Sequence, residues 1–317
     1  MASLARSAVD ESLSVEAREA ALLELEDHAG DIDNAHDLMN LGGFEPVVAL
    51  LASELPPLQA AAAWVVGTSV KNHRELQLHV MGLPTAVPSL LQLARSHADV
   101  SVRTKALYAL SALLSNCEEA QAAFASSGGA PALLAVLARA RLEGAPKLVR
   151  KALGLVTDLL REQRAREAAG SGGAVVTAEG EVLPNAAGGD GDGGDGDGGG
   201  GGGGGGGGID VSALLRAEWT NATELCTAVH HCLELDEPDA QEKGVLALDQ
   251  LLASGLLQDV AGSGDGDEGC SLLGVRTALQ SYQKWCDAQV EEDDGGSIGA
   301  CEAVSALDAK LAFIIGV

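Results

Sequence analysis

Three stretches of this sequence share one arrangement of glycine and proline, and their prolines lie 42 and then 43 residues apart. In each stretch glycine comes first, and Pro46, Pro88 or Pro131 then leads into an apolar run. Glycine just past a helix can take the left-handed conformation that ends it. Proline fits the first turn of the next helix, because its missing N–H is not needed there. Each stretch therefore predicts a sharp corner between two helices.

A second pattern follows each corner and keeps nearly the same period. An alanine occupies the same place in three apolar segments, as Ala63, Ala106 and Ala152, at spacings of 43 and 46 residues. Small residues at one helical position let neighbouring helices approach closely. The segment from Glu242 to Leu248 is a more distant fourth copy. Two patterns with one period predict stacked helical repeats and disfavour an irregular helical bundle.

A period in the low forties, with about three helices in each unit, is the armadillo spacing. We therefore expect an all-α, armadillo-like right-handed solenoid of about four repeats with a C-terminal helical extension. Aromatic residues make up only 3% of the chain and hydrophobic residues 46%, which suits closely stacked helices and argues against a β-sandwich. Residues 1–167 would hold an N-terminal capping helix and repeats 1–3. Residues 209–317 would hold the fourth repeat and the capping helices, predicted at 209–235, 239–253, 271–289 and 300–315.

Residues 168–208 lie between these two parts, and we predict that they form a disordered linker rich in glycine and aspartate. They end in eleven consecutive glycines, Gly198–Gly208, which make no apolar contacts that could offset the entropy of ordering. The Asp–Gly alternation before them lacks the third ligand and the closing Glu of an EF-hand loop. We therefore predict no calcium site there.

The acidity of the chain is concentrated in its second half. Up to residue 168 there are 15 basic and 20 acidic side chains, and beyond it 5 basic and 26 acidic ones. Phosphate backbones would repel such a chain, so we expect no nucleic-acid partner. We also expect no membrane partner, because no apolar run approaches the roughly 20 residues that cross a bilayer. Without a signal segment, and with six cysteines that lack framework spacing, the sequence predicts reduced thiols and a cytoplasmic location.

Motifs of catalysis and nucleotide binding are missing, including G-x-x-x-x-G-K-[ST], G-x-S-x-G and H-E-x-x-H. We therefore expect no enzyme, no catalytic residue and no cofactor. The metal-like cluster of the chain consists of Cys226, His230, His231 and Cys232. Cys226 and His230 lie one helical turn apart, but no distant pair completes a tetrahedron, so we assign no metal ligand. A metal-dependent enzyme that uses these two residues stays a third alternative.

One region stands out as basic in this acidic chain. A solvated helix face explains it as well as a positive patch that faces an acidic protein partner. Its members are Arg139, Arg141, Lys147, Arg150, Lys151, Arg161, Arg164 and Arg166.

Four stretches resemble the armadillo-type nucleotide-exchange factors of the heat shock protein 70 chaperones, the Hsp-binding-protein family. They are residues 33–43, 62–72, 102–111 and 146–152. The resemblance covers residues 16–162 well and residues 209–317 weakly. It implies a non-enzymatic co-chaperone, expected to be a monomer, whose concave face grips one lobe of the chaperone's nucleotide-binding domain. Preference for a tilted lobe, which holds ADP poorly, would then speed ADP release.

In that family the contact surface comes chiefly from the third helix of each repeat. Trp64 and Leu107 we expect to pack between repeats instead. The partner-binding residues that the resemblance implies are Thr68, Ser69, Asn72, Tyr108, Ser111, Lys147, Arg150 and Lys151.

The main alternative is a generic armadillo adaptor that binds an extended peptide or another protein on its concave face. Importin-like adaptors use a repeated Trp with Asn four residues later. Here Trp64 is followed by Thr68, and the later repeats have Leu107 with Ser111 and Leu153 with Thr157. The broken pattern favours the exchange factor.

Overall fold

The computed structural model describes residues 1–170, 175–176, 182–183, 223–257, 270–292 and 299–316. The described residues are helical except for turns and one short pair of antiparallel strands, β1 (Val175–Val176) and β2 (Val182–Leu183). Most of the linker predicted at 168–208, with its Asp–Gly tract, lies outside the described residues.

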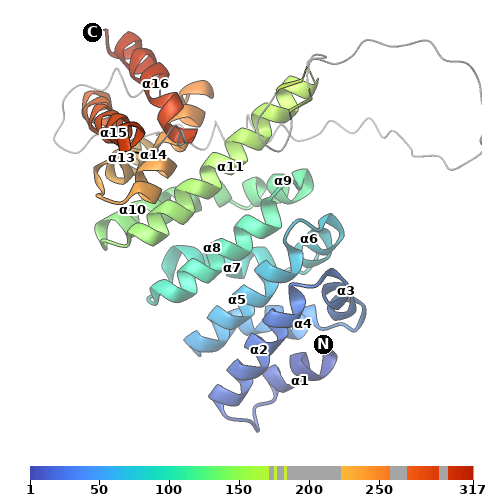
Figure 1. Ribbon diagram of the computed structural model, residues 1–317. Coiled ribbons are helices and arrows are strands. Elements are labelled where there is room, and N and C mark those ends of the chain that lie inside the picture. Colours follow the sequence, from blue (N-terminus) through green and yellow to red (C-terminus); the bar gives the residue numbers. More distant parts are fainter. Residues whose placement is uncertain (171–174, 177–181, 184–222, 258–269, 293–298, 317) are drawn as a thin grey trace, which may run out of the picture.

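The helices up to Gly170 stack in units of three behind an N-terminal pair, α1 (Ala2–Val9) and α2 (Val15–Ala29), as Figure 1 shows. Each unit has a first helix, a middle helix and a long third helix. This arrangement confirms the all-α, armadillo-like solenoid. The units are α3 (Ile32–Asn40), α4 (Phe44–Ala49, extended by the 3-10 turn Leu50–Ala52) and α5 (Pro56–Val70); α6 (Arg74–Met81), α7 (Ala86–Ser96) and α8 (Val100–Leu114); and α9 (Glu118–Ser126), α10 (Gly129–Leu142) and α11 (Pro146–Gly170).

The corners between first and middle helices follow the predicted chemistry with one exception. Pro46, Pro88 and Pro131 are each the third residue of a middle helix, so the first-turn position of all three is confirmed. Gly42 and Gly128 have the left-handed φ values of 65° and 74°. Gly82 has a φ of −70° instead, and the chain turns through the three residues that follow it.

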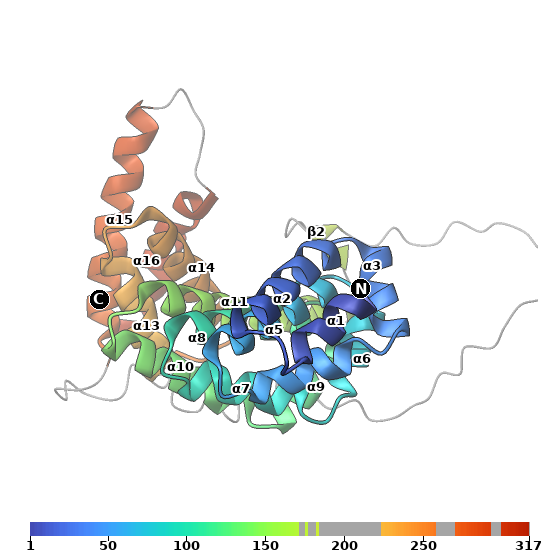
Figure 2. The same ribbon diagram turned by 90° about the horizontal axis from the view of Figure 1, so that it is seen from below.

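The third helices form the centre of the stack. α5 packs against α2 and α8, and α8 packs against α11. The repeated alanines Ala63, Ala106 and Ala152 are fully buried there, which agrees with their predicted role in close helix approach. Seen from below, the third helices lie on the inner side of the curved stack, and α7 and α10 lie on its outer side (Figure 2).

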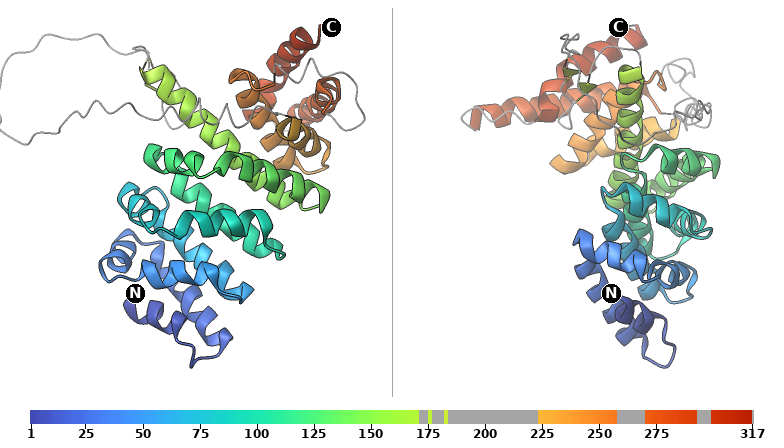
Figure 3. Two further views of the ribbon diagram at one scale, coloured as in Figure 1. Left: turned by 180° about the vertical axis from the view of Figure 1, so that it is seen from behind. Right: turned by 90° about the vertical axis from the view of Figure 1, so that its right-hand side faces the viewer.

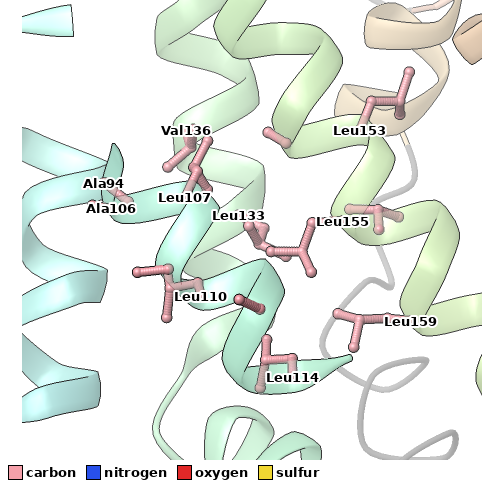
Figure 4. Packing of buried hydrophobic residues seen from close by; sticks show 14 of the residues in the cluster. Ala94, Ala106, Leu107, Leu110, Leu114, Leu133, Val136, Leu153, Leu155 and Leu159 are labelled. Atoms are coloured by element: carbon pink, nitrogen blue, oxygen red, sulfur yellow. The ribbon is translucent and has the colours of Figure 1, made fainter. Parts of the chain in front are cut away.

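One apolar core runs through α8, α10 and α11. Leu107 of α8 lies beside Val136 of α10, and Leu133 of α10 lies beside Leu155 of α11 (Figure 4). All four side chains are buried. Each unit therefore completes its core only by stacking on the next.

The chain continues the stack after the gap with α13 (Thr223–Glu234) and α14 (Pro238–Ala253), which pack on α10 and α11. α15 (Leu272–Glu292) and α16 (Gly299–Ile315) pack in turn on α13 and α14, and they form the end opposite α1 (Figure 3). The helices predicted at 239–253, 271–289 and 300–315 are thus confirmed. α13 matches the second half of the helix predicted at 209–235, and its first half lies outside the described residues.

Four of the six cysteines form disulfides, so the prediction of reduced thiols is wrong for them. Cys226 of α13 is bonded to Cys270, just before α15, and Cys286 of α15 is bonded to Cys301 of α16. The spacing in sequence could not show this, because helix packing brings the partners together. Cys232 is free and buried, and burial raises its pKa to about 12. Disulfides persist in oxidising compartments, so the cysteines do not support a cytoplasmic location.

No single helix of the described residues is long and apolar enough to cross a membrane. The pair α9 and α10 reaches that length and composition together, but it is bent by 75°.

At Gly67, α5 and α8 approach each other closely. A Cβ atom on Gly67 would lie 2.6 Å from Cδ1 of Tyr108 and 3.1 Å from the Cα atom of Ala109. In Gly67→Ala the two helices must separate or the Tyr108 ring must move. We therefore expect the free energy of unfolding to fall by roughly 1–3 kcal/mol, as for other overpacked cores.

Gly154→Ala is the matched control, because nothing lies within 4 Å of a Cβ atom at Gly154 of α11. Alanine should stabilise this helix by about 0.5–1 kcal/mol. Urea unfolding followed by far-UV circular dichroism measures both variants. Equal effects on the two midpoints would contradict the close approach at Gly67.

Candidate functional site

The exposed faces of the third helices form a polar strip along the inner side of the stack. Its side chains are half-buried or exposed. We define this inner strip as Glu26 of α2, Trp64 and Thr68 of α5, Lys105, Tyr108 and Ser111 of α8, and Lys147 and Lys151 of α11.

Hydrogen bonds join the first three helices of the inner strip. The Thr68 hydroxyl donates to Oε1 of Glu26 at 2.7 Å. The Tyr108 hydroxyl oxygen lies 3.4 Å from the Thr68 oxygen. Since Thr68 gives its proton to Glu26, Tyr108 is the donor in this second contact. The side chains of α2, α5 and α8 are therefore linked across the repeats.

Two lysines of the inner strip lie over aromatic rings of the preceding repeat. The Lys105 ammonium is over the ring of Trp64, and the Lys151 nitrogen is 5.9 Å from the centre of the Tyr108 ring. Aromatic faces attract cations through their negative electron density. Partial burial lowers the pKa of Lys105, the Glu26 charge opposes this shift, and the Lys151 charge adds to it.

Thr68, Tyr108, Ser111, Lys147 and Lys151, predicted from the resemblance, all lie on the inner strip. The other three predicted residues have different surroundings.

Ser69 is buried, and its hydroxyl donates to the Val65 carbonyl oxygen at 2.7 Å. Asn72 lies exposed in the turn after α5 with a φ of 62°, and Asn116 repeats this turn after α8 with a φ of 53°. Arg150 is only partly exposed, because it forms ion pairs with Glu237, just before α14, and Asp239 of α14. Ser69 and Arg150 thus make contacts within the chain, and Asn72 lies in a left-handed turn.

The basic region is mostly engaged in contacts within the chain. The contacts are Arg139 with Glu143, Arg141 with Glu224, Arg150 with Glu237 and Asp239, Arg161 with Asp158, Arg164 with Gln250, and Arg166 with Gln121. Those of Arg141, Arg150 and Arg164 tie the third repeat to α13 and α14. Lys147 and Lys151 form no ion pair with the described residues, so they are what remains of the positive patch.

An arginine holds α8 from its buried side. Arg103 is fully buried and forms an ion pair with Glu143, the residue that follows α10. Glu143 also accepts from Nε of Arg139 at 2.7 Å. Hydrogen bonds from Arg139 and Arg103 lower the pKa of Glu143. This contact fixes the helix that carries Lys105 and Tyr108.

Glu26 and Lys105 lie on the inner strip but are not among the residues predicted from the resemblance. Trp64, expected to pack between repeats, is half-buried, and Lys105 of the next repeat covers its ring. Leu107 is buried as predicted. The sequence does contain a pattern that could have predicted Lys105 on this surface: Lys105 and Lys151 each stand one residue before a repeated alanine.

The metal-like cluster loses its first ligand, because Cys226 is bonded to Cys270 and offers no thiolate. Among the described residues, no group of three or more His, Cys, Asp or Glu side chains is placed to hold a metal ion.

This geometry, a curved stack of three-helix units with a polar inner face, defines an armadillo-like repeat protein. A designed armadillo repeat protein is similar to it with a TM-score of 0.62, at 12% identity, over 98% of this chain and 99% of its own. Residues 34–180 match the family model described as the SIL1/FES1/HPBP1 C-terminal domain. The match covers somewhat less than half of the chain, so this part of the chain is similar to that domain.

Three relatives of known name are similar to parts of this chain. The Hsp70 nucleotide exchange factor FES1 of Mycosarcoma maydis is 39% identical over 107 residues, which are 34% of this chain and 27% of the relative. The FES1 protein of Yarrowia lipolytica is 32% identical over 149 residues, 47% of this chain and 52% of the relative. The nucleotide exchange factor SIL1 of Mus musculus is 30% identical over 152 residues, 48% and 32% of the two chains. The chain therefore spans about half the length of these relatives, or less.

The lowered pKa of Glu143 predicts a pH dependence of stability. Its ionised form stabilises the fold, so this contribution is complete above the ordinary pKa of 4.5 and is lost as the pH falls through the lowered value. Glu143→Gln should therefore lower the urea midpoint at pH 7 and flatten its fall between about pH 5 and pH 3.

Glu118→Gln on α9 is the control, since Glu118 is exposed and forms no ion pair with the described part of the chain. If both variants follow the wild-type pH profile, Glu143 does not hold α8 as described.

Proposed function

We propose that this chain is a nucleotide-exchange factor that binds the nucleotide-binding domain of a heat shock protein 70 chaperone through the inner strip. One observation carries the proposal. The SIL1/FES1/HPBP1 domain match at residues 34–180 contains α5, α8 and α11 in full, and these are the helices that carry most of the inner strip. Relatives that match 107 and 149 residues of this chain carry the name Hsp70 nucleotide exchange factor.

The proposed mechanism is a difference in affinity between two shapes of the partner. A ligand shifts a conformational equilibrium only by as much as it prefers one state. An inner strip that fits the chaperone lobe better when the lobe is tilted would favour the state that holds ADP poorly. Reciprocity then requires that nucleotide binding weaken the grip of this protein on the chaperone. Such a mechanism needs no nucleotide site and no catalytic group in the exchange factor.

The contact residues of the proposal are the five predicted residues on the inner strip. Asn72 and Arg150 would border the contact, and Ser69 would support α5 from inside. A monomeric state stays a prediction.

The alternative function, an adaptor for extended peptides, has less support from the geometry. Such binding needs free amide side chains along the third helices. At the corresponding places the Thr68 hydroxyl donates to Glu26, and the Thr157 hydroxyl donates to the Leu153 carbonyl oxygen at 2.8 Å. These groups serve the chain's own structure, so the exchange function is preferred.

A cytoplasmic location also stays a prediction, and the disulfides of α13, α15 and α16 weigh against it. Alkylation of the protein in intact cells, followed by mass spectrometry of the peptides with Cys286 and Cys301, would show whether the disulfide forms where the protein works.

Release of labelled ADP from a heat shock protein 70, followed by stopped flow, tests the exchange function. We expect roughly tenfold faster release with saturating protein, a factor within the usual range of coupling between two sites. An unchanged release rate at saturation would remove the exchange proposal.

Charge reversal tests the inner strip as the contact surface. We expect the Lys147→Glu/Lys151→Glu variant to bind the chaperone domain roughly tenfold more weakly, because two cations that face the partner become anions. Lys284→Glu is the control, since Lys284 is exposed on α15 outside the inner strip. An unchanged dissociation constant for the double variant would refute the contribution of these two lysines.

A further inference from the structure

A groove opens beside the C-terminal end of α13, between this helix, the start of α14 and the first half of α15. The three helices lie together at the end of the stack opposite α1 (Figure 1). The volume of the groove is about 620 Å³, which is within the usual range of ligand-binding pockets. None of its lining residues belongs to the inner strip or to residues 34–180. The groove therefore has no part in the proposed function.

Small residues on α15 leave the space open. Gly274 and Ala278 lie one helical turn apart on the lining side of α15. A Cβ atom at Gly274 would lie 3.2 Å from Cε1 of His230, so the His230 ring borders the groove where α15 has no side chain. The disulfide between Cys226 of α13 and Cys270, two residues before α15, joins the two walls. A site with walls held in this way is formed before a ligand arrives, which favours binding.

Hydrogen-bond acceptors dominate the polar lining. The Thr277 hydroxyl donates to the Leu273 carbonyl oxygen at 2.9 Å, and the Ser281 hydroxyl donates to the Thr277 carbonyl oxygen at 3.1 Å. Since both protons are used within α15, the two hydroxyl oxygens offer a ligand only their lone pairs. Glu234 and Asp236 add two exposed carboxylates. A ligand of this groove must therefore bring the donors.

The charge around the groove favours a cation. Among the described residues no lysine or arginine lines it, and Arg276 of α15 binds Asp308 of α16 at 2.8 and 3.1 Å. Glu234 is the last residue of α13, and the C-terminal end of a helix attracts positive charge. The chain beyond residue 168 holds 5 basic and 26 acidic side chains, so its field draws cations towards this end of the molecule.

An arginine side chain matches these features together. Leu233, Leu235 and Ala278 give the groove an apolar wall beside its carboxylates. A guanidinium is planar and weakly hydrated, so its faces can lie against apolar side chains while its N–H groups point to acceptors in its plane. A lysine ammonium is compact and strongly hydrated. The apolar wall and the acceptors thus favour arginine over lysine.

We propose that this groove binds an arginine side chain of a partner protein, with the carboxylates of Glu234 and Asp236 accepting from the guanidinium. The surface of the partner that docks here is basic. Because the groove shares no residue with the inner strip, this site is independent of the proposed nucleotide exchange.

Peptide binding to the full chain tests the site. The probe is the peptide Ac-Gly-Ala-Arg-Ala-Gly-NH2 at physiological salt, and the same peptide with citrulline keeps the shape of arginine without its charge. Backbone NMR signals of residues 274–281 in 15N-labelled protein should shift with the arginine peptide and require an about tenfold higher concentration of the citrulline or lysine peptide. If these signals do not shift at millimolar arginine peptide, or if the three peptides bind equally, the proposal is wrong.

Two matched double variants separate the groove from the overall charge. Glu234→Gln/Asp236→Asn should weaken binding of the arginine peptide about tenfold, because two anions become neutral amides. Asp287→Asn/Glu302→Gln removes the same charge from exposed positions of α15 and α16 outside the groove, and should bind as wild type does. Ser281→Leu keeps both carboxylates but fills the groove, and should also prevent binding. Circular dichroism checks that each variant is folded. Equal weakening by the two double variants would overturn the site.

Discussion

The close packing of the third helices is the constraint on which the rest of the structure depends. The repeat places alanine where α5, α8 and α11 meet, and Gly67 leaves no room for even one methyl group against Tyr108. When helices approach so closely, polar side chains of one helix can reach those of the next. For this reason Thr68 can reach both Glu26 and Tyr108, and the polar inner strip is continuous. The surface proposed to bind the partner is thus a product of the small residues beneath it.

Charge contributes to the placement of the C-terminal helices. The first 168 residues hold most of the basic side chains and the remainder is strongly acidic. In the structure Arg141 and Arg150 of the third repeat meet Glu224, Glu237 and Asp239 at the start of α13 and around the start of α14. The uneven charge therefore orients the C-terminal helices on the stack. The lysines of the inner strip are left for contacts outside the chain.

Local chemistry at repeated positions could be predicted from the sequence. Proline in the first turn and alanine at the helix contact depend only on neighbouring residues and on the period, so Pro46, Pro131 and Ala106 fall where expected. Partners that meet only through packing could not be predicted. Two examples are the disulfide between Cys226 and Cys270 and the contact of Lys105 with the Trp64 ring. In both, the partners come from separate segments, and their spacing in the sequence does not predict the contact. The place of Lys105 one residue before a repeated alanine matches that of Lys151, which could have suggested its role. A lysine on a helix is usually exposed to solvent, however, so the pattern alone does not predict a contact.

Gly67 of α5 and Gly154 of α11 have different surroundings. At Gly67 the joint between α5 and α8 is filled, whereas at Gly154 there is open space around α11. Each unit touches only its neighbours, so flexing of the whole array is the sum of small rotations at successive joints. A side chain added at Gly67 would therefore change the angle between α5 and α8, whereas one added at Gly154 would leave the position of α11 unchanged.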